Sequence, residues 1–483
     1  MPFPNRRDLV AVLFSDCGLA YDLPAHALRV LDVLERAGYE AWVVGGWVRD
    51  ALRGAPSHDV DVTTSAHWQE AKRALESEGI VVHETGTAHG TVTAVVDGEP
   101  IEITTYRVEG DYSDHRHPDE VRFVSDVRED LARRDFTVNA IAYHPVRGLL
   151  DPFGGQQDLA DGLIRAVGDP RARFAEDALR VLRAVRFAAR LGFKVEENTH
   201  LALVEAAPGL SDIAQERIGQ ELDGIVRTGK ASWALLAEPE VMCAALPELA
   251  PMYGFDQCSP WHAYDVYEHT MRVCRACEEF TAGCAADELR WAALLHDVGK
   301  PATFTMDASG RGHFSGHPKV GAKMAADILR RLALPKAYIA RICTLIRFHD
   351  HMMHPTGRSI RRTLVKLEQA CPGDARALIF QLIDLKRGDA VSKVPRAALY
   401  VKDLDAITLA ARREMGKRPP LSVAELAVGG WDVIDALCIA PGPAVRRVLD
   451  ELLFSVINGE VENDRDALLA LVRGVGPVPR ELR

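Results

Sequence analysis

The sequence predicts an α+β fold, in which a β-containing N-terminal head precedes a mostly α-helical remainder. Within residues 22–148, the stretches Thr91 to Val96 and Ile101 to Tyr106 alternate polar with apolar residues in part, which is typical of strands with one buried face. From Phe174 onward, the pattern is helical, and proline and glycine residues punctuate it. We therefore expect a small mixed sheet followed by helices.

The head begins with a helix and then a strand, a glycine turn and a second helix. The first helix is predicted over residues 24–37, because Pro24 suits a first helical position and Gly38 supplies a C-terminal stop. The β-prone residues 41–44 end at a Gly-Gly pair, and a further helix is predicted over residues 47–53. This arrangement leaves the glycine pair at the end of a strand.

The length of the chain indicates several packed units. With 483 residues, it exceeds what one ordinary hydrophobic core serves. We expect four segments: a head over residues 22–148, a helical neck and body over 149–260, a third domain over 261–400 and a helical tail over 401–483.

The net charge of −11 argues weakly against nucleic-acid binding, because contacts to phosphate depend on local cations and not on the total. Local basic clusters do occur, although a solvated helix face would look the same. In the second cluster, spacings of three and four place the side chains near one helical face. The clusters are Arg133 with Arg134, and then Arg180, Arg183, Arg186 and Arg190.

The cysteines and the apolar runs indicate a cytoplasmic protein. Nine scattered cysteines do not form a disulfide framework, so we interpret them as reduced thiols. The single CxxC, at Cys274 and Cys277, falls in a predicted helix and has no second pair to complete a zinc site. No long apolar run or cleavage site indicates secretion or membrane insertion.

Two carboxylates in the head are the candidate catalytic metal ligands. Asp59 and Asp61 lie two apart on a predicted strand, so both side chains point to one face, where they could share Mg²⁺ ions for phosphoryl transfer. A solvated strand face would show the same Asp-x-Asp pattern. Glu102, between two apolar neighbours on another predicted strand, is either a third acidic group at the metals or a surface glutamate.

The glycine pair strengthens the catalytic interpretation. Gly45 and Gly46 allow a triphosphate to approach the backbone, and the following helix offers oriented N–H groups. We expect Gly45, Gly46 and Arg49 to hold the phosphates beside the Asp59 and Asp61 metal site.

These residues lie within longer motifs. The motifs are GGWVRD from Gly45, HDVDVTTSA from His58, RRDFTVNA from Arg133 and EDALRVLRAVRF from Glu176. Together they resemble the class II tRNA nucleotidyltransferase and poly(A) polymerase family, part of the polymerase β superfamily. The resemblance covers nearly the whole chain beyond the first twenty or so residues.

The resemblance implies a polymerase-β-like nucleotidyltransferase head that adds or repairs the 3′-terminal CCA of tRNA from CTP and ATP without a template. It also implies that Asp177 and Arg180 read the base edge, since residues three apart on a helix can present an acceptor and a fork of donors. By the same resemblance, Glu216 and Arg217 brace the neck. The nucleotide-binding residues that it implies are Arg134, Asp135, Asn139, Asp177, Arg180, Arg183 and Arg186.

Two further segments resemble parts of this family. The polar residues 111–120 are similar to the loop of enzymes that add the final A, which counts against an enzyme that adds only C. Residues 421–464 are similar to the tRNA-binding tail, where Arg446 and Arg447 could meet phosphate.

A second metal constellation resembles the HD superfamily of metal-dependent phosphohydrolases. The order His269, His296-Asp297, Asp389 carries this resemblance, and such ligands suit divalent ions. The resemblance leaves open whether this domain hydrolyses phosphate or is a structural module. Four more histidines could ligate a second ion: His313, His317, His349 and His351.

Three alternatives stay open. An A-adding enzyme or a poly(A) polymerase would share the head motifs. An HD phosphohydrolase could use the head only to bind RNA, and a non-catalytic tRNA-binding protein would add no nucleotide. The expected partners are tRNA, CTP and ATP without a membrane, and the sequence leaves the oligomeric state open.

Overall fold

The computed structural model describes residues 22–57, 59–110, 121–283, 286–394 and 398–474. The described chain forms two compact units. The first runs to Ile225 and includes Glu238–Ala245, and the second contains Val226–Ala237 and the residues from Leu246 onward.

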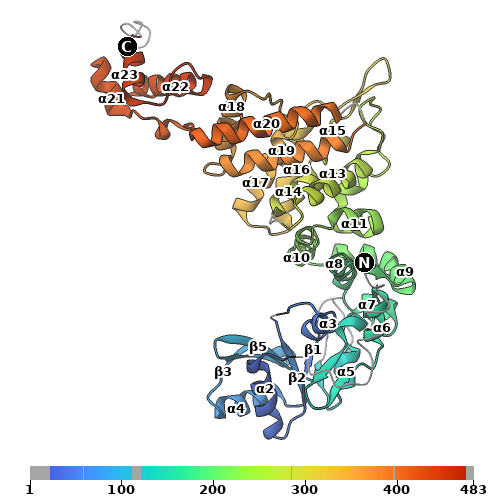
Figure 1. The fold of residues 1–483 in the computed structure, drawn as a ribbon. Coiled ribbons are helices and arrows are strands. Elements are labelled where there is room, and N and C mark those ends of the chain that lie inside the picture. Colours follow the sequence, from blue (N-terminus) through green and yellow to red (C-terminus); the bar gives the residue numbers. More distant parts are fainter. Residues whose placement is uncertain (1–21, 58, 111–120, 284–285, 395–397, 475–483) are drawn as a thin grey trace, which may run out of the picture. The chain divides into compact units, whose positions relative to one another are not determined.

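The head of the first unit contains a seven-stranded mixed sheet with the strand order β3-β4-β5-β2-β1-β8-β9 (Figure 1). Strands β2 and β5 pair in parallel, and the other neighbours pair antiparallel. The predicted mixed sheet is therefore confirmed. Its strands are β1 (Ala41–Val44), β2 (Asp61–Thr64), β3 (Val81–Gly86), β4 (Thr91–Val96), β5 (Glu99–Thr105), β8 (Ala142–His144) and β9 (Gly148–Leu150).

Two apolar clusters cover the centre of this sheet from opposite sides. Val43 and its neighbours pack with α2 (Ala25–Arg36) and α4 (Trp68–Ser77), whereas Trp42 and Val44 pack with α5 (Val127–Ala132). Strand β1 is consequently buried at all four positions. The expectation of a single buried face is wrong for this strand, because α5 covers its second side.

Helices complete the first unit. The helix α3 follows β1 directly, and the arginine-rich segment forms α8, in agreement with the sequence. In α8, apolar side chains make up most of the buried face. The arginine side chains of α8 line the cavity next to the sheet. The helices are α3 (Gly46–Leu52), α6 (Gly155–Asp161), α7 (Pro170–Glu176), α8 (Leu179–Leu191), α9 (Glu197–Ala206), α10 (Gln215–Arg227) and α12 (Pro239–Ala245).

The second unit is almost entirely helical. Cys274 and Cys277 are buried free thiols on α13, and burial raises the pKa of both. The last three helices share an apolar cluster of their own. The helices are α11 (Ala231–Ala237), α13 (Val266–Phe280), α14 (Asp287–Leu295), α15 (Lys300–Thr303), α16 (His317–Arg331), α17 (Lys336–Phe348), α18 (Gly357–Ala370), α19 (Ala375–Val391), α20 (Ala398–Lys417), α21 (Gly430–Leu437), α22 (Pro443–Asn458) and α23 (Arg465–Gly474).

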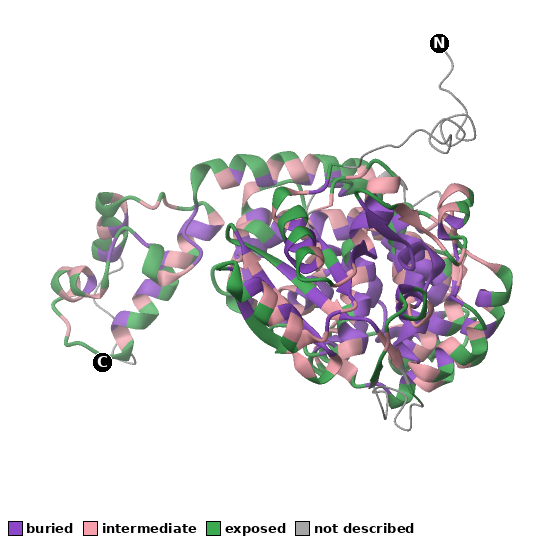
Figure 2. Cartoon of the chain, turned by 90° about the horizontal axis from the view of Figure 1, so that it is seen from below, coloured by how far each residue is buried: buried purple, intermediate pink, exposed green. Residues whose placement is uncertain are grey.

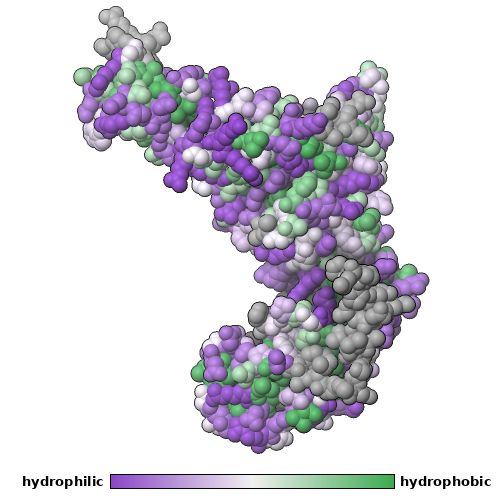
Figure 3. Space-filling model, viewed as in Figure 1, coloured by the Kyte–Doolittle hydropathy of each residue, from purple (hydrophilic) through white to green (hydrophobic). Residues whose placement is uncertain are grey.

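Burial and hydropathy follow the elements closely. Figure 2 shows buried residues along the inner sides of helices and strands, and exposed residues on their outer sides. The face in Figure 3 is mainly hydrophilic, with apolar residues in small groups. Across the residues that the structure describes, no helix combines the length and the apolar character that crossing a membrane requires.

Gly299 lies in the short connection between α14 and α15. The helix α14 ends at Leu295, and Gly299 has a right-handed backbone (φ −80°) just before α15. A side chain at this position would lie 2.6 Å from both the Gly321 nitrogen and the His317 carbonyl oxygen of α16. Gly299 therefore allows two backbones to approach closely.

We predict that Gly299→Ala lowers the free energy of unfolding by about 1–3 kcal/mol, because the added methyl group meets backbone that cannot move aside. Gly416→Ala is the matched control, since Gly416 in α20 has no atom within 4 Å of the added group. Urea denaturation of both variants measures the difference. Equal stability of the two would show that the contact between α15 and α16 is not tight.

Candidate functional site

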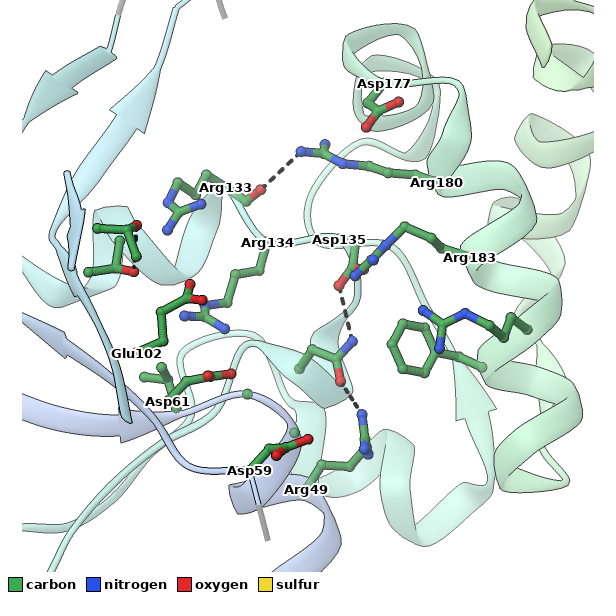
Figure 4. Close-up of a pocket in the computed structure, with 18 of the residues that line it drawn as sticks. Arg49, Asp59, Asp61, Glu102, Arg133, Arg134, Asp135, Asp177, Arg180 and Arg183 are labelled. Carbon is green, nitrogen blue, oxygen red and sulfur yellow. Dashed lines mark hydrogen bonds and ion pairs between the residues drawn. The ribbon is translucent and has the colours of Figure 1, made fainter. Parts of the chain in front are cut away.

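The predicted head residues all line one open cavity in the first unit. This cavity has a volume of about 670 Å³ and receives side chains from the sheet and from α8. Figure 4 shows Asp59, Asp61 and Glu102 on one side of this cavity, and Asp177 and Arg180, the predicted base-reading pair, on the other. The predicted residues in its wall are Gly45, Gly46, Arg49, Asp59, Asp61, Glu102, Arg134, Asp135, Asn139, Asp177, Arg180, Arg183 and Arg186.

Strand pairing brings two of the three carboxylates together. Asp61 is the first residue of β2 and lies opposite Glu102 on the parallel strand β5. Asp59 precedes the strand, so its predicted place on the strand is wrong. The reason is that β1 ends at Val44, which pairs with Asp61, and offers no partner further along. The Asp59 side chain still reaches the same cavity (Figure 4).

The negative charges of these carboxylates repel one another. Enclosure by the cavity walls raises the pKa of Asp61, and the neighbouring Asp59 raises it further against the effect of Arg134. Enclosure and Asp61 likewise raise the pKa of Glu102. Carboxylates in such surroundings are stabilised by a cation. Their ligand atoms are nevertheless not gathered within 4.8 Å of one another as they are in the second site described below.

The glycine turn lies against Arg134. Gly45 has a φ of +73°, which glycine adopts without strain, and a side chain there would lie 2.9 Å from Arg134 Nη1. The buried Nε of Arg134 has no hydrogen-bond partner among the described residues. Arg49 is placed differently from Arg134, because it donates to Asp50 and, at 2.7 Å, to Asn139. Arg134 is thus the arginine closest to Gly45, whereas Arg49 Nη2 would lie 3.7 Å from a side chain at Gly46.

A buried network joins the head to α8. Arg183 donates from Nε and Nη2 to Asp135 Oδ2 at 2.9 and 2.6 Å, and Asn139 donates to Asp135 Oδ1 at 3.1 Å. Burial alone would raise the pKa of Asp135, but Arg183 and Asn139 lower it to about 2. Asp135 therefore stays ionised and holds both partners in place.

Asp177 and Arg180, the predicted base-reading pair, do not share a helix. Asp177 has an extended backbone between α7 and α8, whereas Arg180 lies in the first turn of α8, so the expected helical spacing is wrong. The Asp177 side chain also caps this turn through the Leu179 nitrogen at 3.0 Å. Arg217 on α10 donates to Asp177 Oδ2 at 2.9 Å, which agrees with its expected bracing role. Both Asp177 and Arg180 face the cavity (Figure 4).

The sequence did not reveal two buried acids behind the cavity. Asp130 on α5 accepts hydrogen bonds from Arg133 at 2.9 Å and from the Thr63 hydroxyl at 3.1 Å. Glu221 on α10 accepts one from Arg186 at 2.5 Å. No motif or spacing in the sequence singled out either residue. The polar residues 111–120, expected to favour addition of the final A, lie outside the described residues.

A second cavity, of about 550 Å³, lies in the second unit beside a cluster of histidines. Two groups have ligand atoms that all lie within 4.8 Å of one another, and they share Asp297. His269 and His296 complete the first group, and His317 and His349 the second. Asp389 accepts a hydrogen bond from His269 at 3.1 Å, although it belongs to neither group.

Backbone carbonyls orient three of these histidines. The Nδ1 atoms of His296, His317 and His349 lie 2.8, 2.8 and 2.7 Å from the carbonyl oxygens three residues before them. Each Nε2 is therefore left as the ligand atom. Burial lowers the pKa of His349 to about 3, which keeps its imidazole neutral and able to bind metal.

The structure separates the four further histidines of the sequence prediction. His317 and His349 belong to the cluster. His313 on β13 (Gly312–His313) is exposed and pairs with Asp307 at 2.7 Å, and His351 follows α17, so the structure brings neither into a ligand group. His313 nevertheless lines the second cavity.

The head and the region of the chain that contains the histidine cluster each match a known protein domain. Residues 41–165 match the Poly A polymerase head domain, and residues 266–409 match the HD domain. A CCA-adding enzyme of Geobacillus thermodenitrificans is 37% identical over 444 residues, which is 92% of this chain and 95% of that protein. The chain belongs to the CCA-adding enzyme family. It is accordingly a tRNA nucleotidyltransferase.

Other members of the family agree along the whole chain. The CCA-adding enzyme of Geobacillus stearothermophilus is 33% identical over 446 residues, covering 92% of this chain and 95% of that one. The crystal structure of the Bacillus stearothermophilus CCA-adding enzyme in complex with CTP superposes with a TM-score of 0.69 at 30% identity, over 93% of this chain and 96% of that chain. The family fold therefore includes both units.

We predict that Arg183→Met changes the pH dependence of stability. The folded pKa of Asp135 lies below the ordinary value of 3.8, so its ionised form contributes stability above that value, which is lost as the pH falls towards about 2. Without Arg183, burial raises this pKa, and stability should instead fall as the pH rises through it.

Urea midpoints from acidic to neutral pH test this prediction. Arg171→Met removes a matched arginine whose pair with Glu205 is exposed, and it should change little. A parallel profile for Arg183→Met and the wild type would contradict the proposed role of the buried pair.

Proposed function

We propose that this chain adds or repairs the 3′-terminal CCA of tRNA from CTP and ATP, by nucleotidyl transfer in the head cavity. One observation carries the proposal: three carboxylates, a glycine turn with an adjoining arginine, and the polar pair Asp177 and Arg180 all line a single cavity. The named function of relatives along the whole chain supports it.

In the proposed reaction, the tRNA 3′-hydroxyl oxygen attacks the α-phosphorus of the nucleotide. A new phosphodiester bond forms, and the bond to pyrophosphate breaks. Asp59, Asp61 and Glu102 would hold Mg²⁺ ions, which supply activation of the hydroxyl and charge neutralisation at the leaving oxygen. The carboxylates fit such ions, because partial desolvation in the cavity and then repulsion by a neighbouring carboxylate raise the pKa of Asp61 and Glu102.

The turn at Gly45 would hold the triphosphate. The nearest side-chain atoms to a Cβ at Gly45 would be Arg134 Nη1 at 2.9 Å and Asp61 Oδ2 at 3.9 Å, and the buried Nε of Arg134 lacks a hydrogen-bond partner among the described residues. A guanidinium group can donate two parallel hydrogen bonds to phosphate oxygens. Arg134 therefore combines the right position and an unused donor.

Asp177 and Arg180 would select the base in place of a template. Asp177 offers carboxylate oxygens, and Arg180 offers a planar fork of donors, so that together they can pair with a Watson–Crick edge. Neither side chain moves freely, since Arg217 holds Asp177, and Glu176 with the Arg133 carbonyl holds Arg180. Such a preorganised pair discriminates by about 1–3 kcal/mol per good bidentate contact.

We predict that Asp59→Asn and Asp61→Asn each lower nucleotide addition about a thousandfold, because the metal contributes several kcal/mol to the transition state. Purified protein with Mg²⁺ and tRNA lacking CCA is offered CTP, ATP or both. Asp97→Asn, an exposed acid of the same unit, is the control and should keep full activity.

The nucleotide arms separate the alternatives. Completion of CCA only with both nucleotides supports the proposal. Addition of A only to tRNA ending in CC would indicate an A-adding enzyme, and a long A tail would indicate a poly(A) polymerase. Undiminished addition by the Asp59 and Asp61 variants would contradict the assigned site.

A second activity, metal-dependent phosphate hydrolysis, is favoured by one observation in the HD domain. Asp297 is fully buried among imidazole nitrogens, with His296 Nε2 at 3.1 Å and His317 Nε2 at 3.4 Å, beside Lys300 Nζ at 2.6 Å. A carboxylate that faces several imidazole nitrogens is suited to binding a divalent metal ion. We propose that His269, His296, Asp297 and Asp389 serve one divalent ion, and that His317 and His349 serve another through Asp297.

We predict that His296→Ala removes most of the bound transition metal and any phosphatase activity, while CCA addition is retained. Elemental analysis of the purified protein measures the metal directly. His351→Ala is the matched control, because His351 lies outside both ligand groups. Equal metal content in both variants, or no phosphatase activity in the metal-loaded wild type, would contradict the assignment.

A further inference from the structure

The wall of the head cavity continues beyond the predicted nucleotide site. In the sheet, β5 and then β4 lie on the side of β2 that faces away from β1 and its glycine turn. Thr91 on β4 and Thr104 on β5 line the cavity there, with their hydroxyls 3.1 Å apart. His89 and Arg107 line it as well. Neither the sequence motifs nor the proposed function uses this group.

The chemistry requires a second ligand on that side. In an in-line displacement, the attacking oxygen and the leaving pyrophosphate lie on opposite sides of the α-phosphorus. Gly45 and Arg134 would hold the leaving group on the β1 side of Asp61. The attacking 3′-hydroxyl must then come from the β5 side, past Glu102, which is where the unused wall lies.

Arg107 gives this wall its positive charge. It begins β6 (Arg107–Glu109), and its charge lowers the pKa of Glu102 against the effect of enclosure. Its position is fixed at two points, since its backbone nitrogen donates to Asp130 at 3.3 Å and its Nη1 donates to the His89 carbonyl oxygen. A guanidinium held beside the third carboxylate is suited to an RNA phosphate.

We propose that Arg107, with His89 and the Thr91–Thr104 hydroxyl pair, forms the binding site for the 3′-terminal ribose-phosphate of the tRNA substrate. This inference rests on the proposed nucleotidyl transfer. The hydroxyl pair faces the ribose, and Arg107 contacts the phosphate that precedes it. The site thereby holds the attacking hydroxyl next to Asp61 and Glu102.

The test measures binding of tRNA ending in CC to Arg107→Ala in EDTA, so that no reaction occurs, over a series of salt concentrations. We expect the Kd to rise about tenfold and the slope of log K against log salt to fall by about 0.7, as for one lost contact to a single strand. The KM for CTP in the Mg²⁺ reaction should stay unchanged. Arg107→Lys keeps the charge and should restore the slope.

Arg122→Ala is the matched control. Arg122 is exposed, lies on the strand β7 (Val121–Phe123) that pairs with β6, and is not part of the cavity wall. It should leave the slope intact. The effect of Arg107→Ala should also disappear with an acceptor-stem RNA whose single-stranded 3′ end has been removed.

An unchanged tRNA Kd in Arg107→Ala, the same loss with the truncated RNA, or a rise confined to the KM for CTP would overturn the site. Failure of the proposed function is distinguishable, since wild-type protein would then add no nucleotide in Mg²⁺ whatever the binding measurements in EDTA show.

Discussion

The ion pair between the buried Asp135 and the partly exposed Arg183 is the interaction on which the head cavity depends. Asp135 belongs to the segment that leaves α5, and Arg183 belongs to α8, so the pair fixes the helix that carries Arg180 against the sheet that carries Asp61 and Glu102. Asn139 extends the link to Arg49 and so to the helix behind the glycine turn. This network therefore holds the proposed phosphate-binding turn, the carboxylates and the α8 arginines around one cavity.

Local sequence patterns predicted which residues line the cavity better than they predicted the ends of the helices and strands that carry them. The glycine turn, the acidic residues and the arginine series were all identified from spacing or family motifs, and all line the same cavity. The errors concern continuity. Asp59 was placed on a strand and Asp177 on a helix, yet each lies just outside the element. The ends of helices and strands depend on tertiary partners, which sequence periodicity does not encode. For example, β2 begins at Asp61 because β1, its partner, ends at Val44.

The residues that the sequence did not reveal share a physical reason. Asp130 and Glu221 act from behind the wall, and an acid at a buried helical position has no distinctive spacing. The histidine cluster shows the same limit. His313 and His317 are close in sequence, but only His317, at the start of α16, belongs to a group of potential metal ligands. Residue type predicts what a side chain can bind, whereas the direction of the chain decides whether it does so.

The pair formed by Asp177 and Arg217 has an evolutionary consequence. The carboxylate that is suited to reading the base comes from the α7–α8 junction, but its orientation is set by an arginine on α10, some forty positions later. A substitution at either position therefore alters the setting of the other, and their effects cannot simply add. Under the proposed function, a change of base preference would therefore require coordinated replacements at the α7–α8 junction and on α10, because the orientation of Asp177 depends on Arg217.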